Sequence, residues 1–257
     1  TEAVRGTAPL CLDPAPRASS AGWIYAPREP LPGFYETGSD LAALVLAHLP
    51  DGVDGLPLIE LPAPHPADLV AVVLSGDGGW RDIDKNIAES LQRDGVSVVG
   101  LDSLRYFWSR KSPDDVARAL VAVLEQNPAK HVALIGYSFG ADVLPFAYNR
   151  LPAGLKSRIV LMSLLGFAKT ADFEITLTGW LGAPPSDQAL PVAPELAKIP
   201  PALMQCFYGE DEEDTACPSL SAGADIVKTP GGHHFDGDYA ALAKHILDDF
   251  RRRTGVK

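Results

Sequence analysis

The sequence predicts an α/β fold in which helices flank a mostly parallel central sheet. From residue 67 onward, apolar runs of strand length alternate with segments of helical periodicity, as in consecutive βα units. The chain has 257 residues, of which 46% are apolar, and this is enough for one substantial buried core. The sequence shows no internal repeat, so a solenoid or propeller is not expected.

Residues 1–66 are rich in proline and leave little room for regular elements. Eleven of the 23 prolines fall there, so we expect an extension or linker that packs on the domain of residues 67–257 without contributing to its sheet. One short helical pattern covers residues 38–50, with Ser39 or Asp40 as its N-cap. The first residues lack the pattern of a signal peptide, so for an exported protein we expect that this chain begins after the cleaved segment or has been trimmed.

The strands and helices of the predicted domain follow in order. The apolar runs predict strands at residues 69–74, 96–101, 131–135, 158–164, 202–208 and 224–228. Helical periodicity predicts helices at residues 82–95, closed by Gly95, at 112–127 and at about 238–253, with another after residue 138. Ser112 suits the N-cap of its helix because Pro113 and two acidic residues follow it.

Charge and cysteine content narrow the function and the compartment. The 33 acidic and 22 basic side chains give a net charge of −11, which argues against a nucleic-acid partner. Cys206 and Cys217 flank a polar loop, and a disulfide between them would stabilise the fold by roughly 3 kcal/mol and indicate an oxidising compartment. The alternative is two reduced thiols. Cys11 is then left over, or pairs outside this chain.

Ser138 is the candidate nucleophile. It lies in Gly136-Tyr-Ser138-Phe-Gly140, between an apolar strand and a helical stretch, which is the context of a nucleophile elbow. The serine must adopt a strained backbone conformation, and the small residues two positions away let strand and helix approach each other. The alternative is an ordinary serine in a structural turn.

The partners that a nucleophilic serine needs follow in the order acid, then histidine. His233 is the first candidate for the base and His234 the second. Asp211 is the first candidate for the acid because it lies nearest the strand end among the aspartates, and Glu212 and Asp214 are the alternatives. The adjacent histidines lack a third ligand at metal spacing, so we expect neither a metal nor another cofactor.

Two further loops follow predicted strands. The turn containing Gly76, Asp77 and Gly78, together with the N–H of Phe139, is the expected oxyanion hole, although a glycine-rich turn can also be only a tight connection. The turn lacks the spacing of a P-loop or dinucleotide fingerprint. The second loop either contributes to substrate binding or is a surface loop anchored by aromatic residues; its candidates are Asp102, Arg105, Tyr106 and Trp108.

Six segments taken together resemble the VirJ/AcvB family of bacterial virulence proteins over about residues 60–252. They are SGDGGWRDIDKNIAESL, LDSLRYFWSRKSP, GYSFGADVLPF, ADFEITLTGWLG, CFYGEDEEDTACP and PGGHHFDGDY. Residues 1–66 are similar to the end of the extra N-terminal domain of AcvB-type proteins plus its linker.

The resemblance implies an α/β-hydrolase fold and a periplasmic enzyme that cleaves the aminoacyl ester of lysyl- or alanyl-phosphatidylglycerol through Ser138 and His233. It also implies transient contact with a membrane surface and a link to virulence, with type IV secretion components as partners. We expect Glu210 and Glu213 to attract the ammonium group of the substrate, and residues 173–180 with Phe167 to form an apolar rim. The competing hypotheses are a noncatalytic protein that binds secretion components or cargo, and a generic esterase or thioesterase.

Overall fold

A seven-stranded sheet forms the centre of the protein. The computed structural model describes residues 55–176 and 186–256, which all belong to the second of two units of the chain, residues 48–257. The strand order is β1-β3-β2-β4-β5-β8-β9, and β1 alone runs antiparallel to its neighbour. The strands are β1 (Leu58–Leu61), β2 (Leu69–Leu74), β3 (Ser97–Leu101), β4 (His131–Tyr137), β5 (Ile159–Leu165), β8 (Met204–Gly209) and β9 (Asp225–Thr229).

The predicted fold class and the predicted strands are confirmed, apart from small shifts of their ends. The expectation that residues 1–66 contribute nothing to the sheet is wrong, because β1 lies within that range and pairs with β3. An edge strand needs hydrogen bonds on one side only, so a short strand flanked by Pro57 and Pro62 is tolerated there. The predicted helix at residues 38–50 lies outside the described residues.

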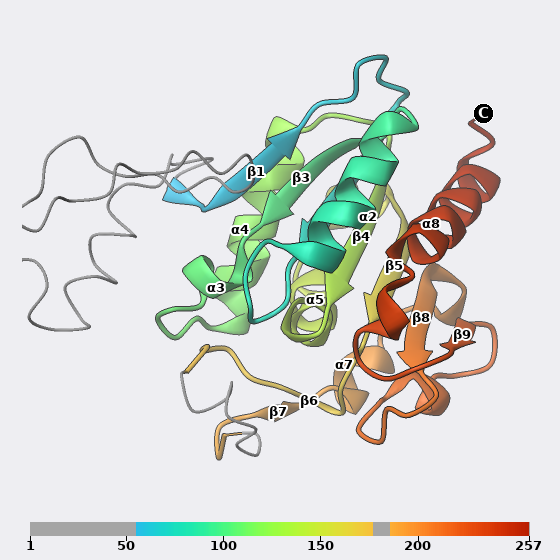
Figure 1. Ribbon diagram of the computed structural model, residues 1–257. Helices are drawn as coiled ribbons and strands as arrows, with labels where there is room; N and C mark the ends of the chain where they lie inside the picture. The colour runs from blue at the N-terminus through green and yellow to red at the C-terminus, as the bar shows by residue number, and fades with distance from the viewer. Residues whose placement is uncertain (1–54, 177–185, 257) are drawn as a thin grey trace, which may run out of the picture. The chain divides into compact units, whose positions relative to one another are not determined.

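Helices cover both faces of the sheet (Figure 1). One face packs against α2 (Asp82–Arg93) and α8 (Tyr239–Thr254), and the other against α4 (Pro113–Gln126) and α5 (Phe139–Asn149). The shorter elements are α3 (Ser103–Tyr106), α6 (Ala153–Lys156), α7 (Ala193–Leu196), the 3₁₀ turns η3 (Pro201–Leu203), η4 (Cys217–Ser219) and η5 (Phe235–Gly237), and the two-stranded sheet of β6 (Thr170–Ala171) and β7 (Leu190–Pro191).

Local sequence signals fix the helix ends. Ser112 caps α4 as predicted: its hydroxyl accepts a hydrogen bond from the N–H of Asp115 at 3.1 Å, and the Asp115 carboxylate accepts one from the Ser112 N–H at 2.8 Å. After α2 the chain turns at Gly95, whose φ of +88° suits glycine. The cap fixes where α4 begins, and the turn at Gly95 fixes where the chain leaves α2 and returns to the sheet.

Alternate residues of the strands fill two cores. Along β2, Val70, Val72 and Leu74 pack towards α4 and α5, while Leu69, Ala71 and Val73 pack towards α2 and α8. Each fully buried aliphatic side chain of this kind contributes about 1.5–3 kcal/mol of burial free energy. The parallel strands β2, β3, β4, β5, β8 and β9 form one continuous layer, and the loops at their carboxyl ends lie along one edge of the sheet (Figure 1).

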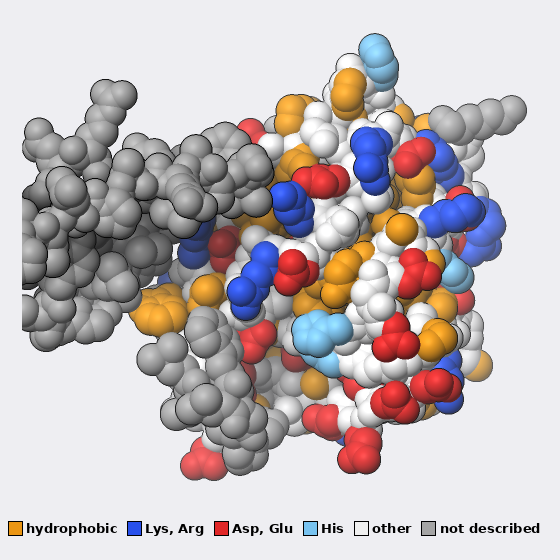
Figure 2. Space-filling model, viewed as in Figure 1, with side chains coloured by type: hydrophobic (Ala, Val, Ile, Leu, Met, Phe, Trp, Pro, Cys, Tyr) orange, Lys and Arg blue, Asp and Glu red, His pale blue; other side chains and the backbone are white. Residues whose placement is uncertain are grey.

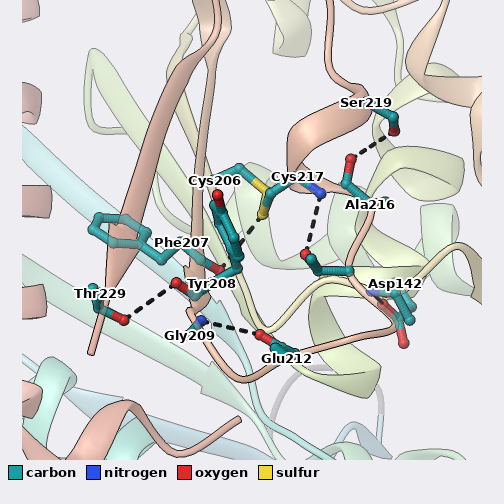
Figure 3. The surroundings of a disulfide bond; sticks show 12 residues. Asp142, Cys206, Phe207, Tyr208, Gly209, Glu212, Ala216, Cys217, Ser219 and Thr229 are labelled. Carbon is teal, nitrogen blue, oxygen red and sulfur yellow. Dashed lines mark hydrogen bonds between the residues drawn. A yellow bond between two sulfur atoms is a disulfide. The ribbon is translucent and has the colours of Figure 1, made fainter. Parts of the chain in front are cut away.

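The predicted disulfide is confirmed. Cys206 in β8 and Cys217 in η4 are bonded, their Cα atoms lie 5.6 Å apart, and neither residue is exposed (Figure 3). The bond ties the acidic loop that follows β8 to the core. None of the helices in the described residues is long and apolar enough to cross a membrane.

Candidate active site

Ser138 lies at a sharp turn between β4 and α5. Its φ of 50° and ψ of −122° put a non-glycine residue in a strained conformation. The flanking glycines permit this turn: a Cβ on Gly136 would lie 2.6 Å from the Cα of Ala141, and a Cβ on Gly140 would lie 2.2 Å from the carbonyl oxygen of Leu74. The predicted strand, turn and helix are therefore present, and the turn presents the Ser138 hydroxyl at the edge of the sheet.

His233 is the histidine that reaches the serine. Its Nε2 lies 2.9 Å from the Ser138 hydroxyl, within hydrogen-bonding distance. His234 is directed elsewhere, with its Nδ1 2.9 Å from the hydroxyl of Tyr137. The same hydroxyl also donates to the carbonyl oxygen of His233 at 3.3 Å, so Tyr137 anchors the histidine loop to the strand that precedes the serine.

Glu212, not Asp211, is the acid that contacts His233. Its Oε1 lies 2.6 Å from the Nδ1 of His233, and its Oε2 accepts a hydrogen bond from the N–H of Gly209 at 3.3 Å (Figure 3). The chain turns immediately after β8, where the N–H of Glu212 donates to the carbonyl oxygen of Gly209 at 3.1 Å. This turn brings Glu212 back towards the histidine and leaves Asp211 exposed, so the first choice from the sequence is corrected.

Gly166, at the end of β5, makes room for the imidazole. Its φ is +59°, and a Cβ there would lie 2.7 Å from the Cε1 of His233. The loop that follows is held by Asp142, whose carboxylate accepts a hydrogen bond from the N–H of Ala168 at 2.8 Å. Burial raises the pKa of Asp142 well above its ordinary value. Sequence reasoning missed Gly166, because a single glycine after a strand carries no signal of what it packs against.

The glycine-rich turn after β2 lies directly beside Ser138. A Cβ on Gly76 would lie 3.6 Å from the Cβ of Ser138 and 3.1 Å from the ring of Tyr137. The N–H of Gly79 donates to the carbonyl oxygen of Gly76 at 3.1 Å and closes the turn. The N–H groups of Asp77 and Gly78 make no hydrogen bond within residues 55–176 and 186–256.

Phe139, the other predicted oxyanion donor, is the first residue of α5. The first N–H groups of a helix have no partner within the helix, so this N–H can bind a ligand. The predicted oxyanion residues therefore lie next to the serine from two sides, as stabilisation of a developing oxyanion requires.

A cavity of about 490 Å³ opens onto the serine and histidine. Its walls come from the turn after β2, the start of α2, the elbow and the histidine loop. They comprise Gly76, Asp77, Gly78, Gly79, Arg81, Asp82, Ile83, Asp84, Tyr137, Ser138, His233 and His234. The charged side chains of the wall are thus three carboxylates and one guanidinium, all from residues 77–84.

Comparison with known families fits this geometry. A family model described as "Bacterial virulence protein (VirJ)" matches residues 68–254. The chain belongs to the VirJ family. The match covers all the strands of the main sheet except β1 and all the residues in contact around Ser138. A search of curated protein sequences gave no significant match.

Solved structures share the α/β-hydrolase fold of this VirJ-family protein at low sequence identity. Est1E from Butyrivibrio proteoclasticus, solved with ferulic acid, is 13% identical with a TM-score of 0.54, and the alignment covers 80% of this chain and 98% of that chain. MenH from S. aureus is 16% identical with a TM-score of 0.58, over 76% and 97% of the two chains. An esterase from Exiguobacterium antarcticum is 13% identical with a TM-score of 0.57, over 78% and 98%. These similarities establish the fold.

The remaining acidic candidates of this VirJ-family protein do not line the cavity. Glu210, Glu213 and Asp214 are exposed. Glu210 lies 3.7 Å from the ammonium of Lys228, and Asp214 lies 3.3 Å from that of Lys169. Figure 2 shows acidic side chains gathered at the end of the molecule where β5 and β8 terminate, which is a solvated surface. The expectation that Glu210 and Glu213 face the substrate is therefore not supported by their positions.

The loop after β3 is also not part of the cavity wall. Asp102 caps α3, accepting a hydrogen bond from the Arg105 N–H at 3.2 Å, and its carboxylate lies 3.2 Å from the Arg105 guanidinium. The hydroxyl of Tyr106 donates to the carbonyl oxygen of Asp115 at 3.0 Å, and Trp108 is 38% exposed. The contacts of Asp102 and Tyr106 hold the loop in place. The loop lies away from Ser138 because β2 separates β3 from β4.

The predicted apolar rim is wrong for the residues that the structure describes. Phe167, Phe173 and Ile175 are all buried and belong to the core on the α4 and α5 side of the sheet. Residues 177–180, the rest of that segment, lie outside the described residues. Large apolar side chains in a loop can lie in the core or at the rim of a site. The sequence around Phe167, Phe173 and Ile175 does not distinguish these two positions.

The sequence did not indicate that Arg81 and Asp84 line the cavity, because the pattern of their segment predicts only the start of a helix. Asp84 is 3% exposed and lies between Ile83 and Ile87 on the buried side of α2. A carboxylate within the apolar stripe of a helix is unusual, and this position was the available signal. Burial raises the pKa of Asp84 to about 8.

Proposed function

We propose that this protein is a serine hydrolase that cleaves the aminoacyl ester of aminoacyl-phosphatidylglycerol. The observation that carries the proposal is the chain of contacts from Ser138 through His233 to Glu212, which opens onto a cavity beside unpaired backbone N–H groups. A structural serine needs none of these partners.

The geometry supports acylation of Ser138. The Nε2 of His233 takes the proton of the Ser138 hydroxyl as the oxygen attacks the ester carbonyl, and the Glu212 carboxylate stabilises the imidazolium that forms. The N–H of Phe139 and those of Asp77 and Gly78 stabilise the negative charge on the carbonyl oxygen. As the intermediate collapses, the bond from the carbonyl carbon to the glycerol oxygen breaks, and the imidazolium protonates that departing oxygen, which leaves as the hydroxyl of the glycerol headgroup.

Deacylation reverses these roles. A water molecule attacks the acyl group on Ser138 while His233 accepts its proton, and the same N–H groups bind the second oxyanion. The serine oxygen then leaves with the proton from the imidazolium. The products are a free amino acid and phosphatidylglycerol.

The charges of the cavity favour an aminoacyl phospholipid over a neutral ester. In such a substrate the scissile ester lies between an ammonium group on the acyl side and a phosphate on the alcohol side. Asp77, Asp82 and Asp84 supply carboxylates for the first, and the exposed guanidinium of Arg81, which lies over Gly78, can bind the second.

We further propose a periplasmic location with transient contact at the membrane surface. The disulfide between Cys206 and Cys217 supports an oxidising compartment, and an ester carried by a membrane lipid requires access to the bilayer. Membership of a family of bacterial virulence proteins supports a link to virulence. The proposed connection to type IV secretion components depends on that family link alone.

Two measurements on the purified protein test the proposed activity. The first is covalent labelling by a fluorophosphonate, which requires an activated serine and should be lost in Ser138→Ala and strongly reduced in His233→Ala. The second is release of amino acid from lysyl- and alanyl-phosphatidylglycerol in mixed micelles, compared with hydrolysis of small neutral esters.

The two results together separate the candidate functions. Absence of labelling in the folded wild-type protein would show a noncatalytic protein that binds cargo or secretion components. Labelling with rapid hydrolysis of small neutral esters and none of the aminoacyl lipid would instead show a generic esterase or thioesterase.

A further inference from the structure

The Asp84 carboxyl is a buried acid that the triad does not use. It lines the cavity shared by Ser138 and His233, the residue is 3% exposed, and its Oδ1 has no hydrogen-bond partner in the described part of the chain. Leaving one oxygen of a buried carboxyl group without a partner is unfavourable. Its position next to a reaction cavity suggests that a ligand supplies the missing partner.

The surroundings of Asp84 favour a cationic ligand. Burial raises the pKa of Asp84 and outweighs the backbone N–H groups of Arg81, Asp84 itself and Gly76, which lower it. The charged group with the largest effect on it is another carboxylate, Asp102. An ammonium group placed against Asp84 would satisfy the unpaired oxygen and favour the ionised form.

We propose that Asp84 binds the primary ammonium group of the acyl part of the substrate and thereby selects aminoacyl esters. This inference rests on the proposed ester hydrolase function and names the residue that gives it specificity. Gly76 lies between the two sites: it lines the same cavity as Asp84 and Ser138, a Cβ on it would lie 3.6 Å from the Cβ of Ser138, and its backbone lowers the pKa of Asp84. In an α-aminoacyl ester a single carbon separates the amino nitrogen from the carbonyl carbon, so both ends can be bound together.

This arrangement predicts discrimination against acyl groups without an amine. A neutral acyl group would fill the cavity and leave the Asp84 oxygen unpaired, which a buried polar group tolerates poorly. Hydrogen bonding between ionised groups in such a site is stronger than between neutral ones. An amine on the α-carbon and one at the end of a lysyl side chain share this chemistry, and the test distinguishes them.

The test compares three esters of one alcohol, glycerol: the propionyl ester, the alanyl ester, which adds an α-amine, and the 6-aminohexanoyl ester, which carries only a distal amine. The variant is Asp84→Asn, which keeps the size of the side chain but cannot ionise. The matched control is Glu89→Gln, which removes an exposed carboxylate that pairs with Lys85 on the same helix. Fluorophosphonate labelling of Ser138 in each protein checks that the triad is intact.

For Asp84→Asn we expect kcat/KM on the amine-bearing ester to fall roughly 10- to 100-fold, mainly through KM, as for loss of a hydrogen bond to a charged group. The propionyl ester and the labelling rate should change less than about twofold, and Glu89→Gln should match the wild type. The ester whose rate falls identifies the amine that is bound. An equal fall for the propionyl ester would overturn the inference and show that Asp84 only positions the turn.

Unchanged alanyl and 6-aminohexanoyl rates in Asp84→Asn would also overturn the inference. In that case the wild-type rates still stand as evidence for the hydrolase. If the wild-type protein labels with fluorophosphonate but cleaves none of the esters or aminoacyl lipids, the proposed function itself fails. The two failures are therefore distinguishable.

Discussion

The choice of acid in the triad leads to a sharp prediction. Glu212→Gln should nearly abolish ester hydrolysis, while Asp211→Asn should leave it within about twofold of wild type. The two residues are neighbours, and each substitution removes one carboxylate from the same acidic loop. Only Glu212 contacts His233, at 2.6 Å, whereas the side chain of Asp211 is exposed.

The size of the effect follows from the charge that Glu212 supplies. Opposite unit charges about 4 Å apart attract each other by about 4 kcal/mol at an effective dielectric constant near 20. The Glu212 side chain is 10% exposed and the His233 side chain 40%, so water screens this pair in part, which is why the intermediate dielectric constant applies. Losing the attraction in the transition state lowers the rate by about a thousandfold. A glutamine also donates to the Nδ1 of His233 and favours the wrong tautomer, and the analogous change in a serine protease costs about 10⁴ in kcat.

The assay measures kcat and KM on an aminoacyl ester together with the rate of fluorophosphonate labelling. In Glu212→Gln we expect kcat to fall by about 10³ to 10⁴ with little change in KM, because the acid acts on the transition state. Thermal unfolding of each variant checks that the fold is retained. A Glu212→Gln enzyme with more than about a tenth of wild-type kcat, or an Asp211→Asn enzyme as impaired as Glu212→Gln, would refute the assignment.

Three other predictions follow from the structure. Gly166→Ala should lower kcat about 100-fold by displacing the imidazole that its Cβ would meet at 2.7 Å, while Gly154→Ala, whose Cβ meets nothing within 4 Å, should behave as wild type in the same assay. Reducing the Cys206–Cys217 disulfide, which spans a separation of 11 residues, should lower the free energy of unfolding in urea by about 3 kcal/mol, and an unchanged midpoint would contradict this. Because burial raises the pKa of Asp84 from 3.8 to about 8, the wild type should lose stability relative to Asp84→Asn as pH rises from about 4 to 8, by up to about 1.4 kcal/mol per pH unit. Parallel pH profiles of urea unfolding for the two proteins would show that this carboxyl is not buried as described.

The sheet and its order of elements were predictable because burial leaves a strong trace in the sequence. Strands covered by helices on both faces are continuous apolar runs, and LVAVVL of β2 matches this pattern over its full length. The edge strand β1 was missed because it lacks this trace of burial. It is four residues long, only partly buried and bounded by prolines, so neither hydrophobicity nor length distinguishes it from a linker.

The elbow was predictable because it carries a local conformational requirement. The glycines around Ser138 are needed whatever the rest of the chain does. The acid has no such requirement, since all of residues 210–214 are carboxylates and only the turn from Gly209 decides which one faces His233. Hydrogen bonds of the backbone in that turn are tertiary information that spacing along the chain does not contain.

Strand order explains why the charged residues that the sequence proposed for substrate binding, in the loops after β3 and β8, do not line the cavity beside Ser138. β2 lies directly beside β4, so the turn of residues 76–79 and the start of α2 face Ser138. The loop after β3 is one strand further away, and the loop after β8 is two strands away on the other side, from which it reaches the site through the contact between Glu212 and His233. The density of carboxylates in residues 210–214 is therefore a poor guide to what the cavity binds. We therefore place the proposed ammonium site at Asp84, which is buried and lines the cavity, and not in residues 210–214, where Glu212 contacts His233 and the other four carboxylates are exposed.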